Sequence, residues 1–233
     1  MKTKTVRYLI LALGWLLGAS VASAQHYNIS RSHTSEFYLI AQYWKLETGT
    51  LSNVTLPDAP GVNPPMVTGD ISYHTDNTFF WGLGFAYNLT DQFTVRAEFT
   101  FGNPDYKMTY RNSTLSGTAY VHTGRVNADY NFMKTAVTPF VSAGLGYTYF
   151  DTGVPSGPPG YNIWWDYWWG PIVVVSQPTY SDTYFSYNAA AGVRWDPNDR
   201  TALRLALSGN WTDYGRVGTL LATELNLSFS WKF

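Results

Sequence analysis

The chain ends in Leu-Ala-Thr-Glu-Leu-Asn-Leu-Ser-Phe-Ser-Trp-Lys-Phe, residues 221–233. All but one of the odd positions in this stretch are Leu, Phe or Trp, and the even positions are small, polar or charged. Because successive side chains of a strand point to opposite faces of a sheet, this period of two predicts a β-strand with one apolar and one polar face. The rest of the chain has to show which face meets water, lipid or a packed interior.

The other end of the chain has the pattern of an export signal. Met1–Arg7 contains three basic residues, Tyr8–Ser20 is almost wholly apolar, and Ala22-Ser23-Ala24 supplies the small residues of a cleavage site. The apolar run is shorter than the roughly 20 residues of a membrane-spanning helix. We therefore predict a signal peptide over residues 1–24, cleaved near Ala24, and an N-terminal periplasmic segment over residues 25–34.

The composition excludes several classes of function. Removal of the signal peptide leaves 12 of the 15 Lys and Arg against 16 Asp and Glu, a net charge of −4, so we expect no nucleic-acid partner. The chain has no cysteine, which excludes disulfides and thiolate metal sites. Charged residues make up only 13% of the chain, about half the share in a typical soluble domain. This shortage of charge favours a protein surrounded by something other than water.

Alternating segments about as long as the last one recur along the mature chain. The clearest is Phe93–Phe101, which has Phe, Val, Ala, Phe and Phe on one face and Thr, Arg, Glu and Thr on the other. In all, the pattern predicts eight strands, at Ser35–Leu46, Phe79–Leu89, Gln92–Gly102, Gly117–Phe132, Pro139–Phe150, Thr183–Trp195, Thr201–Thr212 and Thr219–Phe233. Each is long enough to cross a membrane as a tilted strand, which takes about 9 to 11 residues.

The connections between these strands alternate in length. Three are tight and rich in turn residues, whereas 47–78 and 151–182 are long and rich in Pro, Gly, Ser, Thr and Asn. Short periplasmic turns and long extracellular loops around an even number of strands are typical of an outer-membrane β-barrel. Because lipid offers no hydrogen-bond partners, the first strand must close against the last. The sequence therefore predicts an all-β protein, with an eight-stranded antiparallel up-and-down transmembrane β-barrel over residues 35–233.

Aromatic residues at the strand ends are expected to form a girdle at each membrane interface. We place the periplasmic girdle at Phe93, Tyr130, Phe132, Phe140, Trp195, Trp231 and Phe233.

These features together resemble a known family. The signal peptide, the eight strands, the asymmetry of the connections and the ending Leu-Ser-Phe-Ser-Trp-Lys-Phe, residues 227–233, resemble the small outer-membrane β-barrel proteins of Gram-negative bacteria, nearest to the opacity-protein-like barrels. The resemblance implies the outer membrane as location and its lipid as partner. In that family the C-terminal aromatic residue resembles the signal that the outer-membrane assembly machinery recognises. The resemblance implies that Phe233 has this role.

The predicted interior is polar and charged. An eight-stranded barrel is just wide enough to be filled by its side chains or to hold one small ligand. By alternation the inward residues include a set of mixed charge: Arg96, Glu98, Arg125, Asp129, Arg194, Arg204 and Glu224. Because buried charges must be paired, we predict a network of ion pairs that fills the lumen. A path for protons or small solutes is the alternative.

Catalysis and metal binding have little support in the sequence. The histidines are His26, His33, His74 and His122, and none is visibly paired with a nucleophile and an orienting acid, as a catalytic triad requires. Nor does their spacing suggest a metal site. We therefore predict no catalytic residues, no metal, no cofactor and no enzymatic activity, with a lipid-modifying outer-membrane enzyme as the less favoured class.

The barrel does not explain the connection 151–182, which contains Trp164, Trp165, Trp168 and Trp169. Tryptophan favours membrane interfaces, and exposed apolar patches mark contact sites. The segment is expected either to fold over the barrel mouth or lean on the outer leaflet, or to bind a surface partner or hydrophobic ligand through these four residues. The expected function is a structural or surface-interaction (adhesin-like) role. A narrow conduit or binding barrel for small hydrophobic molecules is the alternative.

Overall fold

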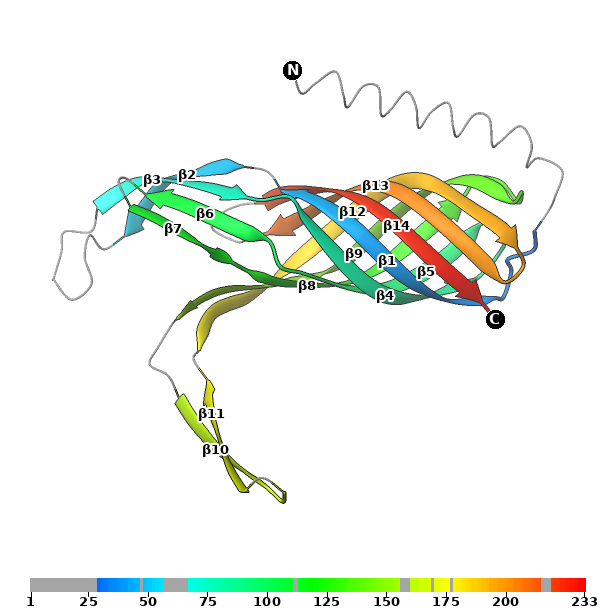
Figure 1. Ribbon diagram of the computed structural model, residues 1–233. Coiled ribbons are helices and arrows are strands. Elements are labelled where there is room, and N and C mark those ends of the chain that lie inside the picture. The colour runs from blue at the N-terminus through cyan, green and yellow to red at the C-terminus, as the bar shows by residue number, and fades with distance from the viewer. Residues whose placement is uncertain are drawn as a thin grey trace.

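The computed structural model describes residues 29–46, 48–56, 67–110, 113–155, 160–168, 170–176, 178–214 and 219–233. The predicted signal peptide lies outside the described residues. Eight strands form a closed antiparallel barrel in the order β1-β14-β13-β12-β9-β8-β5-β4 (Figure 1). Their bounds are β1 Ser35–Leu46, β4 Thr78–Asn88, β5 Phe93–Gly102, β8 Tyr120–Asn131, β9 Val137–Pro155, β12 Thr179–Asn198, β13 Thr201–Asp213 and β14 Thr219–Lys232.

The predicted eight-stranded barrel is confirmed, including its closure. The register of β1 on β14 runs from Glu36 opposite Lys232 to Leu46 opposite Ala222. At the end of this seam the backbone N–H groups of Ser35 and Phe233 each donate to the other residue's carbonyl oxygen at 3.0 Å. Within the described residues there is no helix long and apolar enough to cross a membrane.

The outer and inner faces of the barrel have opposite chemistry. On β14, Leu227 and Trp231 are about half exposed, whereas Glu224 and Ser228 on the other face are buried. The same alternation is present on β1, β4, β5 and β13.

One residue of the predicted periplasmic girdle was placed wrongly. Phe140 is 2% exposed, because the even positions of β9 point inward, and it lines the lumen instead of facing lipid.

Six further strands continue the chain beyond one end of the barrel, where the sequence predicted loops. β2 (Gly49–Leu56), β3 (Val67–Thr75), β6 (Asp105–Tyr110) and β7 (Ser113–Thr118) form a four-stranded sheet, and β10 (Gly160–Asp166) pairs with β11 (Gly170–Ser176). Both units lie at the end of the barrel opposite the C-terminus (Figure 1). We call this the hairpin end, and the end with the short turns the turn end.

The polarity of the wall reverses between the barrel and the four-stranded sheet. On β5, Phe99 is exposed on the outer face and Glu98 is buried inside. On β6, which begins three residues after β5 ends, Lys107 is exposed and Tyr106 is buried. An apolar outer face suits lipid and an apolar inner face suits a core surrounded by water. The edge of the hydrocarbon layer therefore lies between Gly102 and Asp105.

The turn end is closed by the N-terminal segment. The Arg31 side chain is fully buried, and its Nε donates to Asp196 Oδ2 at 2.8 Å. Its Nη2 donates to the carbonyl oxygen of Thr135 at 2.6 Å, and its backbone N–H donates to Asp91 Oδ1 at 2.9 Å. Asp91 and Thr135 lie in two different turns of the barrel and Asp196 lies near the end of β12, so one arginine fastens three connections together.

Candidate functional site

The lumen nearest the turn end is filled by a cluster of ion pairs. Glu36, which is fully buried, accepts from Arg194 Nη2 at 2.6 Å and from Arg204 Nη2 at 2.8 Å through its two oxygens. Arg194 also pairs with Asp196 Oδ1 at 2.9 Å, and Lys232 Nζ reaches the same oxygen at 2.8 Å. With Arg31 on its other oxygen, Asp196 is held by three cations.

A second cluster fills the middle of the barrel. Arg125 is bidentate on Glu224, with Nη1 to Oε2 and Nη2 to Oε1 both at 2.9 Å. Arg96 pairs with Asp129 Oδ2 at 2.6 Å and with Glu98 Oε2 at 3.3 Å. All five side chains are less than 10% exposed. The seven residues that the sequence placed in a polar lumen thus occupy these two clusters. The sequence did not show which of them would pair.

Little room is left between the two clusters. The cavity that borders Arg96, Arg125 and Arg204 has a volume of about 20 Å³, which is enough for about one water molecule. Asn188 Oδ1 and Asn226 Oδ1, which line it, have no hydrogen-bond partner among the described residues. A bound water is the natural donor to both oxygens. A cavity of this size is too small to hold a continuous column of water.

An apolar layer covers these clusters at the hairpin end. Trp44 of β1 and Phe80 of β4 stack with ring centroids 4.1 Å apart, and Tyr106 of β6 packs against them. Tyr106 donates its hydroxyl to the carbonyl oxygen of Thr152 at 2.9 Å, and burial raises the pKa of its phenol. The Arg125 guanidinium lies 5.5 Å from the Trp44 ring centroid, so this layer joins the charged cluster directly. This layer was not predicted from the sequence. The sequence does contain an indication of it: Trp44 and Phe80 are aromatic residues at even positions of strands whose odd positions are already apolar.

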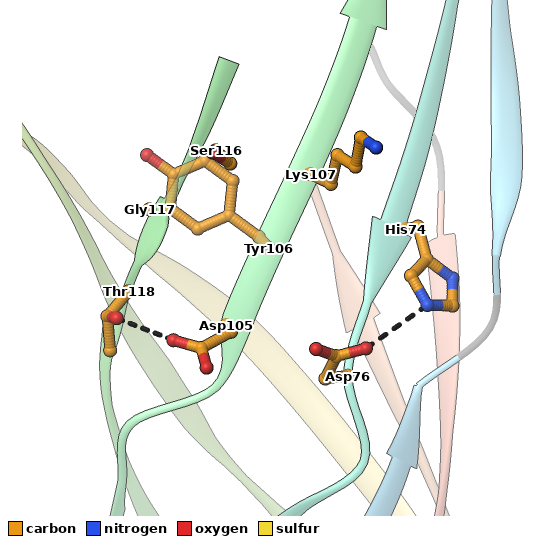
Figure 2. Close-up of a pocket in the computed structure, with 8 residues that line it drawn as sticks. All are labelled: His74, Asp76, Asp105, Tyr106, Lys107, Ser116, Gly117 and Thr118. Atoms are coloured by element: carbon orange, nitrogen blue, oxygen red, sulfur yellow. Dashed lines mark hydrogen bonds and ion pairs between the residues drawn. The ribbon is translucent and has the colours of Figure 1, made fainter. Parts of the chain in front are cut away.

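The outer face of the four-stranded sheet is polar and contains a hollow of about 430 Å³ (Figure 2). Asp105 points toward Thr118, and its Oδ1 accepts a hydrogen bond from the Thr118 hydroxyl at an O–O distance of 2.5 Å. Asp76 points toward His74. The hollow is lined by His74, Asp76, Asp105, Tyr106, Lys107, Ser116, Gly117 and Thr118. Hydroxyl, carboxylate, imidazole and ammonium groups therefore lie together on a surface beyond the hydrocarbon edge.

His74 has partners that the sequence did not reveal. Its Nδ1 lies 2.8 Å from Thr48 Oγ1 and its Nε2 lies 3.2 Å from Asp76 Oδ1. Thr48 is 26 residues away in the sequence, so spacing gave no hint of the contact. The His74 and Asp76 side chains are more than half exposed, so water competes for each hydrogen bond. We interpret the arrangement as a tie between the start of β2 and the end of β3.

The other histidines lie apart from this tie. His122 stands on the outer wall between the rings of Phe101 and Tyr149, at centroid distances of 5.1 and 5.7 Å. His33 Nδ1 lies 3.4 Å from the Tyr87 hydroxyl at the turn end, and His26 precedes the described residues. Across the part of the chain that the structure describes, no group of three or more His, Asp or Glu side chains is arranged to hold a metal ion.

The tryptophan-rich segment forms the hairpin of β10 and β11. The backbone register pairs Trp164 with Ile172 and Trp165 with Pro171, and the hairpin tip carries Trp168, which is 84% exposed. Trp169 lies outside the described residues, as do the side chains of Trp164 and Trp165. The hairpin projects sideways from the hairpin end and does not cross the barrel mouth (Figure 1).

Comparison with known proteins identifies the family. The outer membrane protein beta-barrel domain matches residues 15–233. The chain belongs to this family. As an outer-membrane β-barrel protein it is located in the outer membrane of a Gram-negative bacterium and is embedded in the membrane lipid. Curated protein sequences give no match to it.

Several solved outer-membrane barrels are similar to this β-barrel protein. Outer membrane protein OprG from Pseudomonas aeruginosa is 12% identical, with a TM-score of 0.55 over 87% of this chain and 97% of that one. Neisserial surface protein A is 15% identical, with a TM-score of 0.49 over 85% and 97% of the two chains. Ail, the attachment invasion locus protein of Yersinia pestis, is 10% identical, with a TM-score of 0.45 over 87% and 99%. At these identities OprG supports the fold alone.

Proposed function

We propose that this protein is a sealed, non-enzymatic barrel with a structural or surface-interaction (adhesin-like) role. In this proposal the turn end faces the periplasm and the hairpin end faces the outside of the cell. The last strand, ending in Phe233, carries the signal for the outer-membrane assembly machinery. The contact surfaces are the β strands beyond the hydrocarbon edge.

The observation that carries the proposal is the filled lumen. Two ion-pair clusters and an apolar layer lie in series along the barrel, and the cavity between the clusters holds about 20 Å³. A barrel whose interior is packed offers its outer surfaces for function. The four-stranded sheet and the β10–β11 hairpin are the parts of that surface that lie beyond the barrel wall and carry distinctive side chains.

The two surfaces differ in chemistry, so we assign them different contacts. The hollow around Asp105, Lys107 and Ser116 offers hydrogen-bonding and charged groups to a polar partner. The hairpin offers Trp164, Trp165, Trp168 and Trp169, which we propose as its hydrophobic contact residues. Aromatic anchors of this kind dominate binding energy in many interfaces.

The filled lumen also bears on the alternative role, a conduit for small hydrophobic molecules. An apolar solute that passed the Trp44 and Phe80 layer would next meet Arg125 and Glu224, which are held together at 2.9 Å. Separating this ion pair to let an apolar solute pass leaves two buried charges unpaired, which is strongly unfavourable. We therefore rank the conduit below a surface role.

Conductance of the purified protein in planar lipid bilayers tests the seal. We expect no resolvable ionic current from the native chain, and current only after the middle cluster is opened, as in an Arg125→Ala/Glu224→Ala variant. Steady current through the native barrel at neutral pH contradicts the sealed lumen.

Adhesion of cells that display the protein tests the surface role. The probes are immobilised glycans and extracellular-matrix proteins, and the comparison is with a variant whose residues 160–176 are replaced by a Gly/Ser linker and with Lys107→Ala. Equal adhesion of all three, with equal surface levels, removes support for an interaction role.

A further inference from the structure

We infer that the β10–β11 hairpin is an interfacial anchor whose tip binds the outer leaflet of the membrane in which the barrel sits. This deepens the proposed function by naming the contact of the hairpin, and it rests on the proposed placement of the hairpin end outside the cell.

The sequence of the hairpin is mainly apolar and aromatic. Between Gly160 and Ser176 the one charged residue is Asp166. In the backbone register Ile163 is opposite Val173, and their neighbours Trp164 and Ile172 are opposite each other, so apolar residues occupy consecutive pairs. A water-exposed strand alternates apolar and polar positions. Here one alternating set of β10 is apolar throughout, with Tyr161, Ile163 and Trp165. The other set also contains a tryptophan, Trp164, between Asn162 and Asp166.

The tip of the hairpin is exposed and aromatic. Tyr167 and Trp168 are 88% and 84% exposed, and their rings meet edge to face with centroids 5.3 Å apart. A two-stranded hairpin on its own is at best marginally stable in water. A segment with this composition needs an apolar or interfacial surface against which to lie.

The fold indicates which surface this is. β9 and β12, which carry the hairpin, present Tyr147 and Phe185 to lipid on the barrel wall, with 41% and 56% exposure. The hairpin runs away from the barrel axis, and along the direction of that axis its tip lies nearer the membrane-spanning part than its base does (Figure 1). The two strands that carry the hairpin therefore begin in the lipid-facing belt. Tyr and Trp are the residues that favour the membrane–water interface.

The hairpin fits the interface and not the hydrocarbon core. Its strands have seven residues each, short of the roughly 9 to 11 that a spanning strand needs. An open two-stranded sheet would also leave unpaired backbone groups in lipid. At the headgroup level water can satisfy those groups while the rings lie against the acyl chains.

Site-directed labelling tests the contact directly, because the chain has no native cysteine. Trp168→Cys is labelled with an environment-sensitive fluorophore and reconstituted in phosphatidylcholine vesicles containing phosphatidylcholine spin-labelled near the headgroup. Leu145→Cys, on the lipid-facing wall, is the membrane control, and Ser116→Cys, on the exposed face of β7, is the aqueous control.

We expect the label at position 168 to lose most of its fluorescence to the spin-labelled lipid and to resist iodide in the water phase. The Ser116→Cys label should show the reverse. Quenching of the 168 label by iodide to the same extent as the 116 label overturns the inference. A 168 label that is protected from both quenchers also overturns it, because a second copy or another protein then covers the hairpin. Either result leaves the conductance test of the sealed lumen unaffected, so the two proposals fail separately.

Discussion

Replacement of Arg125 by methionine should cost the barrel much of its stability. Glu224 is fully buried and accepts two hydrogen bonds from Arg125 at 2.9 Å and one from Ser208 Oγ at 3.0 Å. Arg125→Met leaves that carboxylate with the Ser208 bond alone. Removing one partner of a buried ion pair typically costs about 3–5 kcal/mol, because the other charge stays buried and unpaired.

Two matched variants separate this explanation from a general packing effect. Glu224→Gln should cost less than Arg125→Met, because Arg125 keeps Glu98 Oε1 at 4.0 Å and the Trp44 ring beneath its guanidinium. The double variant Arg125→Met/Glu224→Leu removes both charges at similar volume. It should regain most of the loss, because replacing a whole buried pair is often close to neutral.

Urea unfolding of the protein in lipid vesicles, followed by tryptophan fluorescence, measures these differences. With a slope of roughly 2 kcal/mol per molar, the loss for Arg125→Met corresponds to a fall of roughly 1.5 to 2.5 M in the unfolding midpoint. A loss below about 1 kcal/mol, the range of exposed pairs, refutes the reasoning. Water would then reach Arg125 and Glu224, and the lumen would not be sealed.

Three other changes have defined outcomes. Gly84→Ala should block assembly, seen as loss of the heat-modifiable band on a gel, because a Cβ there collides with the Tyr38 ring and a backbone carbonyl oxygen. Leu227→Arg, in the middle of the lipid-facing run of β14, should destabilise the barrel by about 2–4 kcal/mol in urea unfolding. The backbone N–H of Arg31 is the main cause of the lowered pKa of Asp91. This tie should therefore stabilise the N-terminal segment fully above the ordinary aspartate pKa of about 3.9. It should be lost as the pH falls through the lower folded value, and amide hydrogen exchange at Arg31 measures that loss.

The membrane-spanning part of the fold is predictable from the sequence because each solvent acts on one face. Lipid on one side and a polar lumen on the other impose a period of two, as in Phe93–Phe101, and tight turns such as Thr90-Asp91 mark the ends. The inward set was recognisable for the same reason. The pairing of these residues could not be predicted, because partners such as Glu36 and Arg194 are 158 residues apart in the sequence.

Beyond the hydrocarbon edge the alternation of an apolar outer face with a polar inner face no longer holds. The strands in this region were therefore predicted as loops. β2 reads Gly-Thr-Leu-Ser-Asn-Val-Thr-Leu, rich in the residues that indicate loops. The reversed polarity of β6 leaves no continuous apolar face that extends the pattern of β5. Arg31 was assigned to a periplasmic segment without a partner, because nothing local in the sequence shows that it reaches Asp196, 165 residues later.

The β1–β14 seam is fastened at the turn end through one carboxylate. Arg31, before the first strand, and Lys232, at the end of β14, both bind Asp196, and Ser35 is paired with Phe233 beside them. The strand that opens the barrel and the strand that closes it therefore share an anchor on β12. Loss of the Asp196 carboxylate loosens both sides of the seam at once, so the junction depends on three segments that are far apart in the sequence.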